Sequence, residues 1–226
     1  MNKGLARRGG IALDVRSKLI LLLFVAIAYG SNFWPGEWWR SQLFRWLGEP
    51  EYAGFRGLFL PHLLAYVTMT AIVCALLWAL LAKARLVVPP RFALDARVAW
   101  LGAAGGFAAL LLSLLTVWLV APEGTIGWIE PDGWTIAANL VSNFYEEWIF
   151  RGFLLVALTV VIGFWPAAVV ASAMWAWMHP QFPLPMQLML TVIGVGWCWI
   201  SRESKSLWAP YFAHMSLDVV ADSLIA

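Results

Sequence analysis

The feature that most constrains the fold is a set of long apolar stretches without charged side chains. Residues 57–82 and 98–121 contain no Asp, Glu, Lys or Arg. Each is long enough to cross the hydrocarbon core of a bilayer, which takes about 20 residues of α-helix. The whole chain of 226 residues is 62% hydrophobic and 12% charged, whereas soluble domains are roughly 45–50% apolar and 25% charged. Its 16 Trp residues suit a membrane–water interface. The sequence therefore predicts an integral membrane protein.

The apolar segments predict an all-α fold, a polytopic membrane helical bundle forming a single domain over residues 1–226. About seven transmembrane helices are expected, at residues 19–34, 57–82, 98–121, 134–164, 166–178, 186–200 and 207–225. A further helix at residues 37–56 is expected to lie in the interface, because Trp and Leu alternate there with Arg and acids. Gly102 and Gly106 form a G-x-x-x-G pattern that suits close helix packing.

The placement of charge predicts the orientation of the chain. Basic residues gather at the N-terminus, in residues 83–97 and in residues 202–205, whereas residues 122–133 carry acids only. With seven spans all three basic segments fall on one side, so the positive-inside rule makes the N-terminus cytoplasmic. Ala26 to Ala28 resembles a signal-peptide cleavage site, but the apolar run continues past it, which favours an uncleaved anchor. Without organelle signals, a prokaryotic inner membrane is the expected location.

The last hundred residues place ionisable side chains inside apolar segments, where each costs about 2.5–3.5 kcal/mol at the bilayer centre. Glu147 and Arg151 are four residues apart, so they share a helix face and can neutralise one another. A structural buried ion pair is the alternative for these two. Glu146 points about 100° away from that face, which leaves its carboxylate free to exchange protons.

Two later segments add histidines. His179 ends one apolar segment before Pro180, and His214 and Asp218 form an i, i+4 pair that Asp222 extends. Taken by itself, His179 is typical of a residue at a helix end. His214, Asp218 and Asp222 together are typical of a polar contact between two helices. At about 1.5 Å rise per residue, however, Glu146 and His214 fall around the bilayer midplane or a little inward of it, and His179 falls somewhat closer to the outside. We therefore expect two histidines and two carboxylates to converge on one cavity.

Such a cavity could perform two kinds of chemistry. A carboxylate and a neutral imidazole can activate water for attack on a carbonyl, and a second histidine can donate to the oxyanion. The same groups could instead hold a divalent metal such as zinc. Cys74 and Cys198 lie in apolar runs and are interpreted as small core residues. Nothing in the sequence suggests nucleic-acid binding.

The ordered motifs resemble a known family. The chain reads Glu146-Glu147-Trp-Ile-Phe-Arg151, then Trp175-Ala-Trp-Met-His179, then His214-Met-Ser-Leu-Asp218. These are similar to the EExxxR, FxxxH and HxxxN/D motifs of the CPBP family, the CAAX-protease and bacteriocin-processing (Abi) intramembrane endopeptidases. The resemblance covers residues 134–222, which would be the catalytic core, with residues 19–121 as N-terminal spans.

The resemblance implies a glutamic-type endopeptidase that needs no cofactor. Glu146 and His179 would activate water, and His214 with Asp218 would stabilise the oxyanion. The implied substrate is a membrane-anchored or lipidated protein, cut near its C-terminus within the lipid membrane. Two departures stand out, since Trp175 replaces Phe, and Asp218 stands where some members have Asn. The open alternatives are a metal-dependent hydrolase, with zinc held by the same residues, and a non-catalytic immunity or scaffold protein.

Overall fold

The computed structural model describes residues 13–31, 34–47, 64, 68, 72–83, 85–87, 91–120 and 133–224. All the regular elements in these residues are helical, which confirms the predicted all-α class for this part of the chain. In chain order they are α1 (Val15–Gly30), α2 (Trp34–Leu47), α4 (Ile72–Lys83), α5 (Ala96–Val120), α6 (Gly133–Glu147), the π-helix η3 (Trp148–Leu154), α7 (Leu155–Ile162), α8 (Phe164–Trp177), α9 (Leu184–Ser204) and α10 (Trp208–Leu224).

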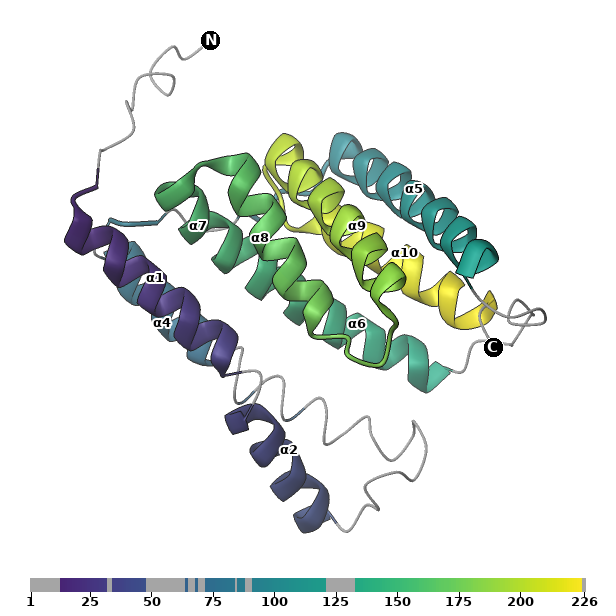
Figure 1. The fold of residues 1–226 in the computed structure, drawn as a ribbon, viewed down its shortest axis with the longest axis horizontal. Helices are drawn as coiled ribbons and strands as arrows, with labels where there is room; N and C mark the ends of the chain where they lie inside the picture. The colour runs from purple at the N-terminus through teal and green to yellow at the C-terminus, as the bar shows by residue number, and fades with distance from the viewer. Residues whose placement is uncertain are drawn as a thin grey trace.

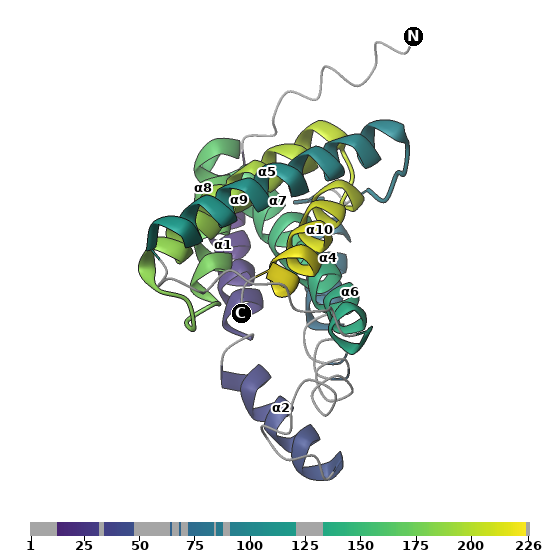
Figure 2. The ribbon, with the colours of Figure 1, turned by 90° about the vertical axis from the view of Figure 1, so that its right-hand side faces the viewer.

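The helices from α5 to α10 form the packed part of the structure (Figure 1). Helix α5 packs on α9 and α10, α8 packs on α7 and α9, and α10 also contacts α6. Helix α1 joins this group by packing on α7, and α4 contacts both α1 and η3. Helix α2 extends away from the other helices in both views (Figures 1 and 2). The core of the bundle lies mainly between α5 and the elements that follow it, with residues of α1 and α4 packed against them.

The G-x-x-x-G pattern on α5 brings α10 close. A Cβ added to Gly102 would lie 2.9 Å from Phe212 Cβ, and one added to Gly106 would lie 2.7 Å from Ser216 Cβ. Neither glycine can therefore take a larger side chain without displacing α10. The expected close packing is confirmed, and it fixes the height of His214, which lies between Phe212 and Ser216 on α10.

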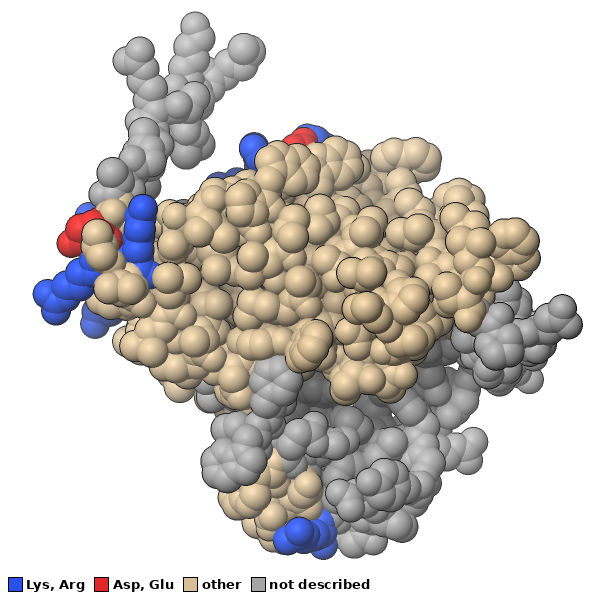
Figure 3. All heavy atoms as spheres, viewed as in Figure 1, with Lys and Arg blue, Asp and Glu red and all other residues tan. Residues whose placement is uncertain are grey.

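Two of the described helices are long and apolar enough to cross a membrane: α5, with mean hydropathy 2.1, and α9, with mean hydropathy 1.4. Helix α8 is apolar but has 14 residues, about 21 Å at 1.5 Å per residue. On the face drawn in Figure 3, charged side chains lie at the edges and the broad surface between them is uncharged. This surface suits contact with lipid. The described helices thus support membrane insertion, while seven spans are not established by them.

Several expected boundaries differ from the structure. The helix expected at residues 37–56 is α2, which begins at Trp34 and ends at Leu47; residues 48–56 lie outside the described part. The stretch at residues 134–164 is one helical run in three parts, α6, η3 and α7, and it ends at Gly163 with φ 84°. The acidic segment at residues 122–132 and most of residues 57–71 also lie outside the described residues.

Candidate active site

The site begins where α6 passes into η3. Residues 148–154 form a π-helix directly after the Glu146-Glu147 pair, and the N–H of Leu155 donates to the carbonyl oxygen of Phe150. A π-turn inside a longer helix is rare and recurs at functional sites. Here the wider turn keeps the side chains of Glu147 and Arg151 on one face, inside the bundle. The sequence carries no signal that would have predicted this local change of pitch.

Glu147 is the centre of a buried polar cluster. Its Oε1 accepts from Arg151 Nη1 at 2.9 Å and from His214 Nδ1 at 3.0 Å. All three side chains are at most 4% exposed. The Glu147–Arg151 pairing follows the sequence expectation. The bond to His214 was missed, because residues 67 apart share no local pattern. Asp218 Oδ2 lies 3.5 Å from the other nitrogen of His214, Nε2. The contact of His214 with Glu147 is therefore shorter than its contact with Asp218.

Two tryptophan side chains pack against this cluster. The Arg151 guanidinium lies 4.8 Å from the Trp175 ring and 5.4 Å from the Trp197 ring, distances at which cation–π attraction operates. The ring of Trp197 also lies 4.6 Å from that of His214. Trp197 was missed from the sequence, where it is one of several Trp in an apolar helix and has no distinguishing neighbour. Both rings exclude water from the ion pair.

Glu146 is held by a different partner. Its Oε2 accepts from Trp175 Nε1 at 2.6 Å, and the Glu146 side chain is 17% exposed. The expectation that Glu146 lacks an arginine partner agrees with this geometry. Its tryptophan partner was missed, although the replacement of Phe by Trp was the available signal, since an indole offers an N–H that a phenyl ring lacks.

His179 lies just beyond the C-terminal end of α8. Its Nδ1 is 3.0 Å from the carbonyl oxygen of Trp175. Because a carbonyl only accepts, Nδ1 must carry the proton of this bond, and in the neutral ring Nε2 is then the acceptor. The ring stacks on Phe182 at 6.0 Å. The backbone of α8 therefore fixes which nitrogen of His179 can act as a base.

These side chains meet at one cavity of about 440 Å³. Glu146, His179, His214 and Asp218 all line it, as their expected depths suggested. The cavity reaches the loop between α8 and α9, where Gln181 and Phe182 also line it. It therefore opens at the end of the bundle at which α5 ends and α6 begins. The side chain of Asp222, expected to extend this stripe, lies outside the described residues.

The geometry of possible metal ligands bears on the zinc alternative. Within the described residues, no group of three or more His, Cys, Asp and Glu side chains is arranged so as to hold a metal ion. Instead, carboxylates lie near both nitrogens of the His214 imidazole. Glu147 Oε1 lies 3.0 Å from Nδ1, and Glu146 Oε2 and Asp218 Oδ2 lie 4.0 Å and 3.5 Å from Nε2. The arrangement offers proton-transfer groups around an open space.

The close approach of α9 to Arg151 gives a stability prediction. A Cβ on Gly194 would lie 2.8 Å from Ser172 Cβ and 3.1 Å from Arg151 Nη2, whereas one on Gly196 would meet nothing within 4 Å. Gly194→Ala is expected to destabilise the protein by about 1–3 kcal/mol through overpacking. Gly196→Ala, on the same helix, is the matched control. Thermal unfolding in detergent measures both, and equal midpoints would contradict the packing of Gly194 on Arg151.

Comparison with known families completes the description of the site. The family model described as Type II CAAX prenyl endopeptidase Rce1-like matches residues 130–220. This segment runs from just before α6 into α10 and contains all six residues of the site. Residues 130–220 are thus similar to a CAAX-protease domain. The family resemblance found in the motifs is thereby confirmed. No curated protein and no solved structure matches the chain.

The indole of Trp175 in this segment has a testable function. Trp175→Phe keeps an aromatic wall but removes the N–H that donates to Glu146 Oε2 at 2.6 Å. Hydrogen bonds to a charged group contribute about 1.5–3 kcal/mol, so we expect kcat to fall roughly 10- to 100-fold with little change in KM. Trp177→Phe is the control, since Trp177 is 66% exposed. An unchanged kcat in Trp175→Phe would show that Glu146 does not need this donor.

Proposed function

We propose that this protein is an intramembrane endopeptidase that hydrolyses a peptide bond of a membrane-associated protein, near the substrate's C-terminus. The proposal is carried by one observation, the convergence of Glu146, His179, His214 and Asp218 on a single cavity within a segment similar to a CAAX-protease domain. A cavity of about 440 Å³ has room for a short extended peptide segment and a water molecule.

The proposed mechanism starts with the activation of water. Glu146, with Oε2 held by Trp175, takes a proton from a water molecule in the cavity, while His179 Nε2 accepts a hydrogen bond from the same water and orients it. The water oxygen attacks the peptide carbonyl carbon, and the carbonyl oxygen becomes an oxyanion. Return of the proton to the peptide nitrogen lets the C–N bond break and the amine leave.

His214 is proposed to stabilise the oxyanion. Its Nδ1 is engaged by Glu147, so Nε2 faces the cavity. Nε2 can donate a hydrogen bond only while protonated, and the imidazolium charge would then lie among Glu146, Glu147 and Asp218. Asp218 is a positioning residue in this scheme. Arg151 balances the charge of Glu147, which keeps that carboxylate directed at His214.

We further propose that the chain crosses a cell membrane about seven times with its N-terminus in the cytoplasm. The apolar segments expected to span contain the described helices α1, α4, α5, α8, α9 and α10 and the run from α6 to α7. The cavity opens at the end of the bundle where α5 ends and α6 begins, and the sequence that joins these two helices carries acids and no Lys or Arg. Under the positive-inside rule this end is external, so the substrate bond would be cut from the outer half of the membrane.

The test compares membranes of host cells that carry either the wild type or Glu146→Ala, with protein C-termini mapped by mass spectrometry. Proteolysis predicts that a small set of membrane proteins loses C-terminal segments only with the wild type. If both strains give the same termini at equal protein levels, catalysis is excluded in favour of an immunity or scaffold role.

A metal measurement separates the glutamic from the metal-dependent mechanism. The glutamic mechanism predicts that wild type and His179→Ala hold the same substoichiometric amount of zinc, and that wild type stays active after chelation. About one zinc per chain, lost in His179→Ala, would instead establish the metal-dependent hydrolase.

A further inference from the structure

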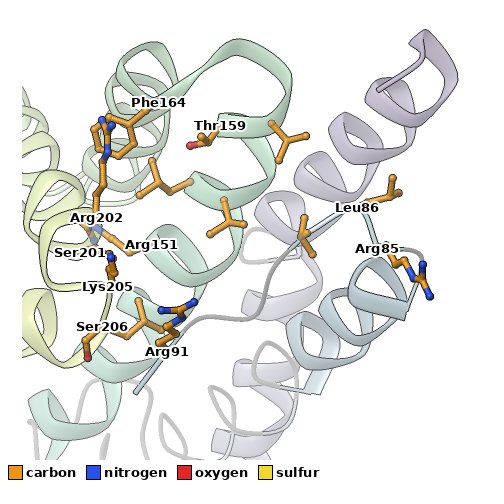
Figure 4. A pocket seen from close by; sticks show the side chains of 15 residues that line it. Arg85, Leu86, Arg91, Arg151, Thr159, Phe164, Ser201, Arg202, Lys205 and Ser206 are labelled. Carbon is orange, nitrogen blue, oxygen red and sulfur yellow. The ribbon is translucent and has the colours of Figure 1, made fainter. Parts of the chain in front are cut away.

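A second pocket lies at the opposite end of the bundle from the active-site cavity. It has a volume of about 680 Å³ and is formed by the segment after α4, by α7, and by the junction of α9 and α10 (Figure 4). Five cationic side chains line it, of which Arg151 is already paired with Glu147 at 2.9 Å, and none of its described lining residues is acidic. They are Arg85, Arg91, Arg151, Arg202 and Lys205. A concave site lined by one sign of charge concentrates ions of the opposite sign.

The backbone at two of these cations is unusual. Among the described residues, Arg85, with φ 60°, and Lys205, with φ 54°, are the non-glycine residues with positive φ. Lys205 is the C-cap of α9, a position at which Gly or Asn commonly takes this left-handed conformation. A lysine there bears steric strain that glycine would relieve. Both residues line the same pocket. The Arg85 side chain points away from it in Figure 4, so it is the strain at Lys205 that points to a use for its charge there.

The pocket also has an apolar wall. Leu155, Val156 and Val160 of α7 and Phe164 of α8 line it, and Arg202 lies over the Phe164 ring at 4.4 Å. This arrangement places cations beside a hydrocarbon surface. A free phosphate ion would use the cations alone, whereas a phospholipid would set its phosphate among the cations and the start of an acyl chain against α7. The combination favours the lipid.

The position of the pocket agrees with this ligand. It lies at the end of the bundle that carries the basic segments 83–97 and 202–205, which the positive-inside rule assigns to the cytoplasmic leaflet. Anionic lipids are found in that leaflet, and basic pockets between membrane helices bind their headgroups. We propose that this pocket binds the phosphate of an anionic phospholipid from the cytoplasmic leaflet.

The test is a binding measurement on the full chain in neutral detergent, with phosphatidylglycerol and phosphatidylcholine as probes and native mass spectrometry as the readout. The decisive variant is Lys205→Gly, which removes one cation and suits φ 54°, so its fold is not at risk. The double variant Arg91→Gln/Lys205→Gln removes two cations that line the pocket. Arg16→Gln/Lys18→Gln removes two cations of α1 that do not line the pocket and serves as the matched control.

Wild type is expected to bind phosphatidylglycerol at least about tenfold more tightly than phosphatidylcholine. Each removed cation should weaken phosphatidylglycerol binding about fivefold, while the α1 control binds as wild type does. Equal affinity in Lys205→Gly and wild type, or equal losses in the pocket variant and the control, would overturn the proposal. Glycerol phosphate is the soluble competitor. If it displaces phosphatidylglycerol only at concentrations far above that of the lipid, the result supports a lipid ligand. Displacement at equal concentration would overturn the proposal in favour of a soluble phosphate ligand.

Discussion

Glu146→Gln is expected to lower the rate of substrate cleavage by about 10²–10⁴-fold, the range that a positioned general base contributes. The amide keeps the size of the side chain and can still accept from Trp175 Nε1, but it cannot take a proton from water. Substrate binding should change little, so the loss should appear in kcat. Purified enzyme in detergent and a peptide spanning the mapped cleavage site provide the measurement.

Glu203→Gln is the matched control for this substitution. Glu203 is 40% exposed, lies near the C-terminal end of α9, pairs with Arg97 at 3.4 Å and is not among the residues that line the active-site cavity. Its activity should equal that of the wild type. If Glu146→Gln retained activity within threefold of this control, the proton acceptor would have to be another group, and His179 would be tested next by His179→Gln.

Helical structure and the general location of the site could be predicted from the sequence because both depend on local properties. Uncharged apolar runs specify helices whatever their neighbours are, and the lengths of those runs give approximate depths. Glu146, His179 and His214 were placed at similar depths in this way, and they line one cavity. The spacing of Gly102 and Gly106 likewise predicted close packing, although it could not identify α10 as the partner.

The contacts that define the chemistry could not be predicted, because they join residues distant in sequence. The bond from His214 to Glu147 depends on the angle between α6 and α10, and that from Trp175 to Glu146 depends on the approach of α8. The π-helix that begins after Glu147 is likewise not encoded in any residue pattern of the sequence. An i, i+4 rule therefore assigned His214 to Asp218, while the tertiary fold gives its closer bond to Glu147.

Arg151→Met is expected to have the largest effect on stability. The Arg151–Glu147 pair is 2.9 Å long, and its side chains are 0% and 1% exposed. Removing one partner of a buried pair typically costs about 3–5 kcal/mol, because it leaves the other charge buried without compensation. Methionine keeps much of the packing against Trp175 and Trp197, so the loss reports on charge. The free energy of unfolding, measured by denaturant titration in detergent, should fall by this amount.

A double-mutant cycle separates the ion pair from its surroundings. Glu147→Gln alone should destabilise the protein, whereas Arg151→Met/Glu147→Gln should lose less than the sum of the single changes, because neither buried charge remains. Arg97→Met breaks the exposed pair with Glu203 and should cost at most about 1 kcal/mol. Strict additivity of Arg151→Met and Glu147→Gln would mean that the two charges do not stabilise one another. If the two changes are instead non-additive, the buried pair supports the fold. If the double variant is also stable but inactive, the pair in addition holds His214 at the cavity.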